Sequence, residues 1–214
     1  MKKDIGYLRK IYKKGTLDLG SVGNDPITFF KKWFDEAQLD EEIDEPNAFN
    51  ISTISNDGFP ASRIVLLKSF DSEGFVFYTN YDSNKGKQII NNPQVCMSFF
   101  WPSLERQIII KGFASKTDDI SSDIYFESRP LGSKLGAIVS NQSSAILNRE
   151  ILEDKLNKLK NTFKSKLPKR PNNWGGFKIS GISYEFWQGR ENRLHDRILF
   201  EKIKDKWIKK RLSP

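Results

Sequence analysis

The sequence is poor in the residues that build metal centres and disulfides. Its 214 residues include one cysteine, Cys96, and one histidine, His195. A single thiol cannot close an internal disulfide, and one histidine with one cysteine cannot supply the usual ligands of a zinc site. We therefore expect neither a disulfide framework nor a metal centre.

Several motifs that would define a function class are also missing. No G-x-G-x-x-G follows a predicted strand, and no G-x-x-x-x-G-K-[ST] loop occurs, which argues against the common nucleotide-binding folds. His195 could serve a hydrolase triad, but no G-x-S-x-G elbow accompanies it.

Signals for export or membrane insertion are lacking as well. No stretch approaches the roughly 20 apolar residues that a membrane span needs. The N-terminal run MKKDIGYLRKIYKK has charges but no apolar core of a secretory signal. We expect a cytoplasmic protein without a membrane partner.

What the chain does have is positive charge and aromatic side chains. Lysine and arginine total 35 against 27 acidic residues, which gives a net charge of +8, and aromatics make up 13%. The aromatic content predicts a globular core rather than a disordered chain. The charge favours anionic partners, and composition alone does not choose among nucleic acid, acidic lipid and phosphorylated metabolites.

The order of the expected elements predicts the fold class. Residues 1–24 are expected to form a mobile arm with a short helix around residues 7–13. Further helices are expected at residues 26–43, 83–92, 118–128, 131–139 and 146–164. Strands are expected at residues 48–54, 63–70, 75–80, 95–101, 107–114, 176–182, 184–188, 197–202 and 207–210. This order predicts a single α+β domain dominated by an antiparallel sheet that could close into a barrel, with peripheral helices.

The strand at Arg63–Lys68 carries a cation at each end. Because side chains alternate along a strand, Arg63 and Lys68 lie on opposite faces. Each could meet a phosphate, or each could extend from a buried strand into solvent.

Two shorter clusters also have binding character. Gln107 enters an apolar strand after Glu105 and Arg106, and its amide could meet the carbonyls and nitrogens at the edge of a flavin ring. Tyr125 and Arg129 share a helix face, so that with Ser128 and Ser133 they could clamp a phosphate. An ordinary polar strand entry and an arginine at a helix end explain the same residues.

The C-terminal segment Glu185–Arg197 is the most informative cluster. It contains three arginines and the only histidine of the chain. If the segment is extended, Arg193, His195 and Arg197 point the same way and repel one another unless an anion or an acidic partner is present. A solvated edge strand is the alternative, and the apolar residues on both sides of the segment argue against it.

This segment resembles the C-terminal signature of the pyridoxine/pyridoxamine 5'-phosphate oxidase family. Further segments resemble that family in the same order, over nearly the whole chain: Arg63–Lys68, Phe77–Asn80, Leu104–Gln107, Ser128–Pro130, Gln142–Ser144, Trp174–Phe177 and Arg211–Pro214. The resemblance implies an FMN-binding split β-barrel and a homodimer with FMN at the subunit interface. It also implies oxidation of pyridoxine or pyridoxamine 5'-phosphate to pyridoxal 5'-phosphate by dioxygen, with release of hydrogen peroxide.

The resemblance also implies roles for individual residues. Arg63 and Lys85 would hold the FMN phosphate. Other FMN contacts would come from Ile64, Val65, Leu66, Leu67, Lys68, Tyr78, Thr79, Asn84, Gln107, Gln142, Ser143, Trp187 and Arg197. The substrate phosphate would be held by Lys68, Tyr125, Arg129 and Ser133. Arg193 and His195 would face the pyridine ring as catalytic residues with Leu194 beside them, and a lid would form from Arg9, Lys10, Ile11 and Tyr12.

The sequence departs from the family pattern at two positions. Asn84 stands where the family more often has an arginine, so one contact to the FMN phosphate would be lost. Arg190 stands where the family often has a small or neutral residue, and we expect it to be exposed.

Three other functions are compatible with these residues. A phenazine-pathway type of split-barrel oxidoreductase would share the FMN contacts but not the full substrate clamp. A non-catalytic carrier would bind pyridoxal phosphate without consuming oxygen. A basic nucleic-acid-binding barrel is consistent with the high pI and with aromatics in strands.

Overall fold

The computed structural model describes residues 3–163 and 167–214. The chain forms two compact units. The first comprises Met1–Asn50, Cys96–Lys111 and Gly181–Pro214, and the second comprises Ile51–Val95 and Gly112–Ser180. The unit boundaries fall inside or beside strands β1 (Ala48–Ile54), β5 (Gln94–Trp101), β6 (Arg106–Lys116) and β7 (Trp174–Gln188). Organisation as a single domain stays a prediction.

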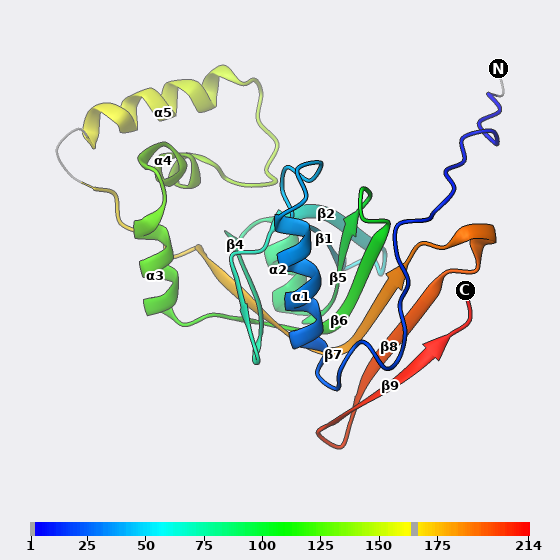
Figure 1. Cartoon of the computed structure of the whole chain (residues 1–214). Coiled ribbons are helices and arrows are strands. Elements are labelled where there is room, and N and C mark those ends of the chain that lie inside the picture. The colour runs from blue at the N-terminus through cyan, green and yellow to red at the C-terminus, as the bar shows by residue number, and fades with distance from the viewer. Residues whose placement is uncertain (1–2, 164–166) are drawn as a thin grey trace. The chain divides into compact units, whose positions relative to one another are not determined.

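The first unit is a sheet with one helix. The strand order is β5-β6-β7, continued by β8 (Asp196–Ile203) and β9 (Lys206–Leu212). The pairs β7·β8 and β8·β9 are antiparallel, and they include the C-terminal end of the chain (Figure 1). A short 3-10 turn, η1 (Glu191–Arg193), joins β7 to β8.

Helix α1 (Pro26–Gln38) begins as its sequence predicts. The Asp25 side chain accepts a hydrogen bond from the Thr28 N–H, and Pro26 occupies the first turn, where its missing N–H has no cost. The helix buries one face, on which Phe29 and Trp33 pack edge-on against Phe186 of β7. Burial of these aromatic rings stabilises the first unit.

The second unit combines short strands with helices. Strand β4 (Gly74–Asn80) lies between β3 (Ser69–Asp71) and β7, antiparallel to both. The other elements are β2 (Pro60–Leu66), α2 (Asn84–Asn91), α3 (Asp119–Ser128), α4 (Leu131–Val139) and α5 (Glu150–Thr162). Gly74 has a φ of 149°, and a Cβ there would lie 2.2 Å from the Ile179 carbonyl oxygen. Only glycine therefore fits where β4 begins against β7.

Most of the predicted elements are confirmed, and several predictions are wrong in detail. The helix expected at residues 26–43 ends at Gln38. The helix expected around residues 7–13 is absent, because the Lys13 and Lys14 N–H groups donate to the Glu105 carboxylate rather than along a helix. The predicted strand 63–70 is interrupted after Leu66, and β3 starts at Ser69. The helix expected from residue 146 starts at Glu150, and its predicted end at residue 164 lies outside the described residues.

The last of these errors concerns β7. The sequence predicts two strands there, separated at residue 183, but β7 is continuous over 15 residues. Gly181, which lies inside this continuous strand, makes room for a ring. A Cβ at Gly181 would lie 2.3 Å from the Tyr184 hydroxyl oxygen.

Two general features complete the fold. Among the described residues, no helix combines the length and apolarity that a membrane crossing requires. The same part of the chain shows no group of histidine, cysteine and acidic side chains that could hold a metal ion.

Candidate active site

A cavity of about 840 Å³ lies in the second unit, and we call it the basic cavity. It collects side chains from β2, β4 and α2, from α3 and α4, and from the segment after α4. The predicted site residues that line it are Arg63, Ile64, Val65, Leu66, Lys68, Tyr78, Thr79, Asn84, Lys85, Tyr125, Arg129, Ser133, Gln142 and Ser143. Leu67 is buried and does not line it. Residues far apart in sequence thus converge on one cavity.

Two cations of the basic cavity are bonded to neutral groups only. Arg63 Nη1 donates to Thr53 Oγ1 (2.6 Å), and Arg63 Nη2 donates to Gln88 Oε1 (3.1 Å). Lys85 Nζ donates to Thr79 Oγ1 (3.2 Å) and to Gln142 Oε1 (3.4 Å). In residues 3–163 and 167–214, neither cation forms an ion pair.

The environment of Lys85 makes its charge costly. Burial, and secondly the charge of Arg63, lower the pKa of Lys85 to about 8. Two neighbouring cations in such a site are stabilised by an anion that neutralises both. A phosphate fits this requirement.

Helix α2 contributes a further electrostatic feature. Asn84 is its first residue, and Ser83 caps it by accepting from the Gly86 N–H. The first turn of α2 lies close to the backbone of Tyr81. Position 86 has to be glycine for this, because a Cβ there would lie 2.3 Å from the Tyr81 carbonyl oxygen. The N-terminal end of a helix favours anions, which partly offsets the absence of an arginine at position 84.

An aromatic stack forms part of the lining of the basic cavity. The Tyr78 ring lies 3.8 Å from that of Tyr125 and 5.6 Å from that of Trp174, with interplanar angles of 14° and 12°. The Arg129 guanidinium lies 4.6 Å from the centroid of the Trp174 ring. Such stacking holds a planar guanidinium in a defined orientation.

Arg129 has unused hydrogen-bonding capacity. Its Nη1 is buried and has no hydrogen-bond partner among the described residues. Burial also lowers the pKa of Arg129. An unsatisfied buried donor on a charged group is unfavourable, so an anionic ligand that accepts from Nη1 would stabilise this arrangement.

A second cavity, of about 470 Å³, lies in the first unit, and we call it the arm cavity. It is lined by predicted lid residues and by predicted catalytic residues: Leu8, Arg9, Lys10, Ile11, Tyr12, Trp187, Arg190, Glu191, Asn192, Arg193 and His195. Leu194 does not line it and is exposed. The N-terminal arm thus lies beside the two residues to which the sequence assigns the chemistry.

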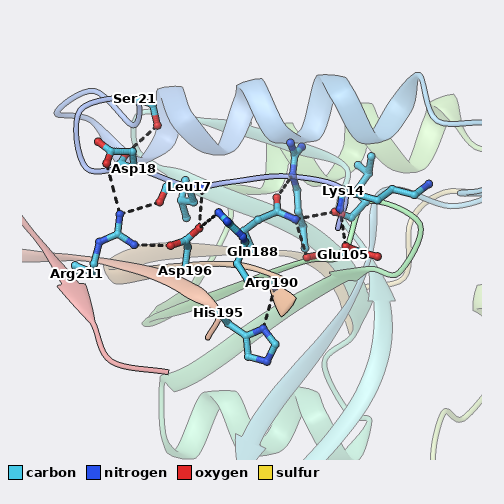
Figure 2. A network of polar contacts seen from close by, with 12 residues as sticks. Lys14, Leu17, Asp18, Ser21, Glu105, Gln188, Arg190, His195, Asp196 and Arg211 are labelled. Atoms are coloured by element: carbon cyan, nitrogen blue, oxygen red, sulfur yellow. Dashed lines mark hydrogen bonds and ion pairs between the residues drawn. The ribbon is translucent and has the colours of Figure 1, made fainter. Parts of the chain in front are cut away.

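The hydrogen bonding of His195 defines its tautomer. Its Nδ1 accepts from the Arg190 N–H (3.1 Å), as Figure 2 shows. In the neutral ring, the proton is then on Nε2. Burial, and secondly the charge of Arg193, lower the pKa of His195, which favours the neutral ring. His195 therefore presents one N–H donor.

The prediction that Arg193, His195 and Arg197 point the same way is wrong. The segment is not extended, because η1 interrupts it and Asn192 and Arg193 have positive φ values of 55° and 61°. Arg197 lies in β8, where its Nε donates to Glu185 Oε1 (2.8 Å). Its Nη1 donates to the Ser213 carbonyl (2.9 Å).

Arg190 is not fully exposed as expected. Its side chain is half-buried, and Nη1 pairs with Asp196 Oδ2 at 3.0 Å. Arg190 and Arg197 therefore have acidic partners within the chain, which is one of the alternatives that the sequence allowed.

Some features of the site were missed or lie elsewhere. No site role was predicted from the sequence for Trp174, whose ring stacks with that of Tyr78. None was predicted for Glu105 either. Gln107 is half-buried on β6. Like Trp187 and Arg197, it belongs to the first unit and does not line the basic cavity.

The fold is similar to that of solved proteins. It resembles PhzG from Burkholderia lata 383, crystallised with tetrahydrophenazine-1-carboxylic acid. The TM-score is 0.86 at 26% identity, over 94% of this chain and all of that one. It also resembles a pyridoxamine 5'-phosphate oxidase-related, FMN-binding protein from Nostoc punctiforme PCC 73102. That TM-score is 0.69 at 14% identity, over 86% and 97% of the two chains. The fold is an FMN-binding split barrel.

Sequence relatives narrow the class to a family. Residues 35–163 match the family model described as pyridoxamine 5'-phosphate oxidase, and residues 174–214 match the pyridoxine 5'-phosphate oxidase C-terminal dimerisation region. A pyridoxine/pyridoxamine 5'-phosphate oxidase from Flavobacterium psychrophilum is 55% identical over 99% of this chain and 100% of that protein. The protein of that name from Christiangramia forsetii is 50% identical over both full lengths. The chain belongs to the pyridoxine/pyridoxamine 5'-phosphate oxidase family.

Proposed function

We propose that this chain oxidises pyridoxine 5'-phosphate and pyridoxamine 5'-phosphate to pyridoxal 5'-phosphate, with FMN as cofactor and dioxygen as electron acceptor. The observation that carries the proposal is the basic cavity, where Arg63, Lys85 and Arg129 have no acidic partner among the described residues. Two phosphate groups, one from the cofactor and one from the substrate, match these cations. Relatives that are 45–55% identical bear the corresponding name.

Arg63 and Lys85 would hold the FMN phosphate, together with the N-terminal end of α2 and Ser143. Ser143 is positioned for this role, because its hydroxyl oxygen already accepts from the Asn84 N–H (3.2 Å). FMN bound there would supply the redox chemistry, a two-electron oxidation of the substrate with dioxygen as the final acceptor. The chain supplies charge and position.

Lys68, Tyr125, Arg129 and Ser133 would hold the substrate phosphate. This group is remote from the carbon that is oxidised, so its binding energy can serve to align that carbon. The stack of Tyr125 and Trp174 keeps the Arg129 guanidinium in place before substrate binds. Little conformational entropy then has to be lost at the binding step.

Arg193 and His195 would contact the pyridine ring of the substrate. The His195 tautomer makes it a hydrogen-bond donor through Nε2 rather than a base, since its Nδ1 lone pair is already used. Arg193 is exposed and adds a positive charge to the arm cavity. In this proposal the two side chains orient the ring, and neither removes a proton from it.

We further propose a homodimer with FMN at the subunit interface. The match of residues 174–214 to a C-terminal dimerisation region supports the dimer. These residues include β8 and β9, and the Arg197 side chain binds the Ser213 carbonyl within them.

The purified protein tests these proposals directly. A flavin spectrum, followed by formation of pyridoxal phosphate and uptake of oxygen when pyridoxine 5'-phosphate is added in air, is the expected result. A yellow protein that is inert toward this substrate would instead fit the phenazine-pathway type, which the 26% identity to PhzG favours less than the named relatives.

Two further outcomes would also contradict the proposal. Binding of pyridoxal phosphate without oxygen uptake would indicate a carrier. A colourless protein that stays inactive with added FMN would remove the flavin from the proposal. A steep salt dependence of nucleic-acid binding would then favour the basic binding barrel.

A further inference from the structure

The Glu105 carboxylate binds the N-terminal arm through the arm's main chain. Its Oε2 accepts from the Lys14 N–H (2.9 Å), as Figure 2 shows. The same oxygen accepts from the Lys13 N–H (2.8 Å). Its Oε1 lies 3.3 Å from Lys10 Nζ. The Glu105 side chain is only 2% exposed, so these donors replace the water that an ionised carboxylate requires.

Glu105 is itself held rigidly. Its φ of 55° places it in the left-handed region, in the turn between β5 and β6. Its carbonyl accepts from the Gly189 N–H (2.8 Å) and from Gln188 Nε2 (3.2 Å). The residue therefore joins the arm to the end of β7, where the predicted site residue Trp187 lies.

Asp196 forms a second anchor a few residues along the arm. Its Oδ2 accepts from the Leu17 N–H (3.0 Å), and its Oδ1 pairs with Arg211 Nη1 at 2.6 Å. Arg211 Nη2 in turn donates to the Leu17 carbonyl (2.9 Å). With Glu105 bound at residues 13 and 14, both ends of the segment 13–17 are fixed.

This anchoring places Tyr12 in the arm cavity. The Tyr12 ring lies edge-on, 5.7 Å from the Trp187 ring and 5.6 Å from the His195 ring. It also packs on Gly189, where a Cβ would lie 2.8 Å from Tyr12 Cγ. Tyr12 directly precedes the two residues that Glu105 binds.

The negative charge of Glu105 strengthens its binding to the arm. Burial alone would raise the pKa of Glu105, but hydrogen bonds from the Lys14 N–H, from Lys10 and from the Lys13 N–H lower it overall. If the arm leaves, the carboxylate loses these donors while its support in the β5–β6 turn stays. Release of the arm is therefore disfavoured.

We propose that Glu105 is a positioning residue, which binds the main chain of the arm and thereby fixes Tyr12 against Trp187 and His195 in the arm cavity. The residue acts through the arm and does not contact the reacting atoms. Its effect on substrate affinity rests on the proposed function, whereas its effect on the arm does not.

The variant Glu105→Gln tests this proposal in the full-length, FMN-loaded protein. The amide keeps the shape of the side chain but loses the charge, and it cannot accept from all three donors. We expect hydrogen exchange of the arm amides at residues 9–17 to become roughly tenfold faster or more, the equivalent of one charge-assisted hydrogen bond. We expect the KM for pyridoxine 5'-phosphate to rise by a similar factor, with kcat and FMN content near those of the parent.

Asp18→Asn is the matched control. It makes the same acid-to-amide change on an exposed arm carboxylate, whose ion pair with Arg211 is long at 3.6 Å. We expect arm exchange and KM to stay at the parent values. Equal acceleration in both variants would mean that any charge change loosens the arm, and it would overturn a specific role for Glu105.

A second variant covers the case in which Glu105→Gln does not fold. Lys14→Pro removes one donor N–H from the exposed arm and leaves Glu105 and the sheet unchanged. It should accelerate exchange at the remaining arm amides and raise KM in the same way. Unchanged exchange and KM in the folded variants would overturn the proposal. Faster arm exchange in a protein that never oxidises pyridoxine 5'-phosphate would leave the anchor standing and contradict the proposed function instead.

Discussion

The two cavities differ in how their cations are neutralised. In the first unit, Arg190 and Arg211 pair with Asp196, and Arg197 pairs with Glu185. In the basic cavity of the second unit, Arg63 and Lys85 bond to neutral oxygens. The cations of a basic sequence segment can thus pair with acidic residues of the same chain or stay available to a ligand. The ion pairs in the structure show which of the two applies to each cation.

Arg193 is the exception that tests this comparison, because it belongs to the first unit but forms no ion pair among the described residues. If unpaired cations serve ligands, Arg193→Ala should lower kcat/KM for pyridoxine 5'-phosphate by roughly a hundredfold, which corresponds to about two charge-assisted contacts. Steady-state kinetics with a parallel flavin spectrum measures this. FMN should remain bound, and its loss would contradict a substrate role.

The next largest effect is expected for the FMN phosphate. Arg63→Ala should weaken FMN binding by roughly ten- to hundredfold, since one charge-assisted contact is lost. Fluorescence titration of the FMN-free protein measures the Kd. Lys178→Met is the control from the same unit, because Lys178 is already paired with Glu73. An equal loss of affinity in the control would refute the distinction between paired and unpaired cations.

Geometry as well as charge should matter at Arg129. Arg129→Lys keeps the charge but loses the planar group that stacks on Trp174 and the fork that can bind a phosphate with two N–H groups. The KM for pyridoxine 5'-phosphate should rise roughly tenfold while the FMN Kd stays constant. A parallel change in both constants would show that Arg129 serves the cofactor.

The smallest effect concerns pH. The pKa of Lys85 is lowered to about 8, so its charge is complete at lower pH and is lost as the pH rises through that value. FMN affinity should therefore fall with rising pH, by roughly fourfold between pH 7 and pH 8.5. In Lys85→Arg, which stays charged, the slope should vanish. A slope that persists in this variant would assign the titration to another group.

Much of the fold could be predicted from local sequence. The alternating burial along β6, the cap at Asp25 and the boundaries of α4 at Leu131 and Val139 follow from patterns, propensities and caps that neighbouring residues determine. The helix predicted around residues 7–13 is absent for the opposite reason, because a distant contact decides the conformation of this segment. Its backbone donors bind Glu105, which lies 92 residues away from Lys13 in the chain.

The candidate site also has one part that could be predicted from the sequence and one part that could not. The residues predicted for the two phosphate groups lie in one cavity, and the predicted lid lies beside His195. Their assigned contacts with FMN and substrate stay predictions. The orientation of Arg193 and Arg197 could not be predicted, because the left-handed residues of η1 look like ordinary polar residues in the sequence.

The sequence by itself determined the family, the order of the strands and helices, and the kinds of side chain that could bind phosphate. These properties depend on residue type and spacing along the chain. Only the tertiary structure decided which cations are paired, which nitrogen of His195 carries the proton, and which carboxylate holds the arm. These depend on contacts between residues distant in sequence, such as Leu17 with Asp196, and no local pattern specifies such contacts.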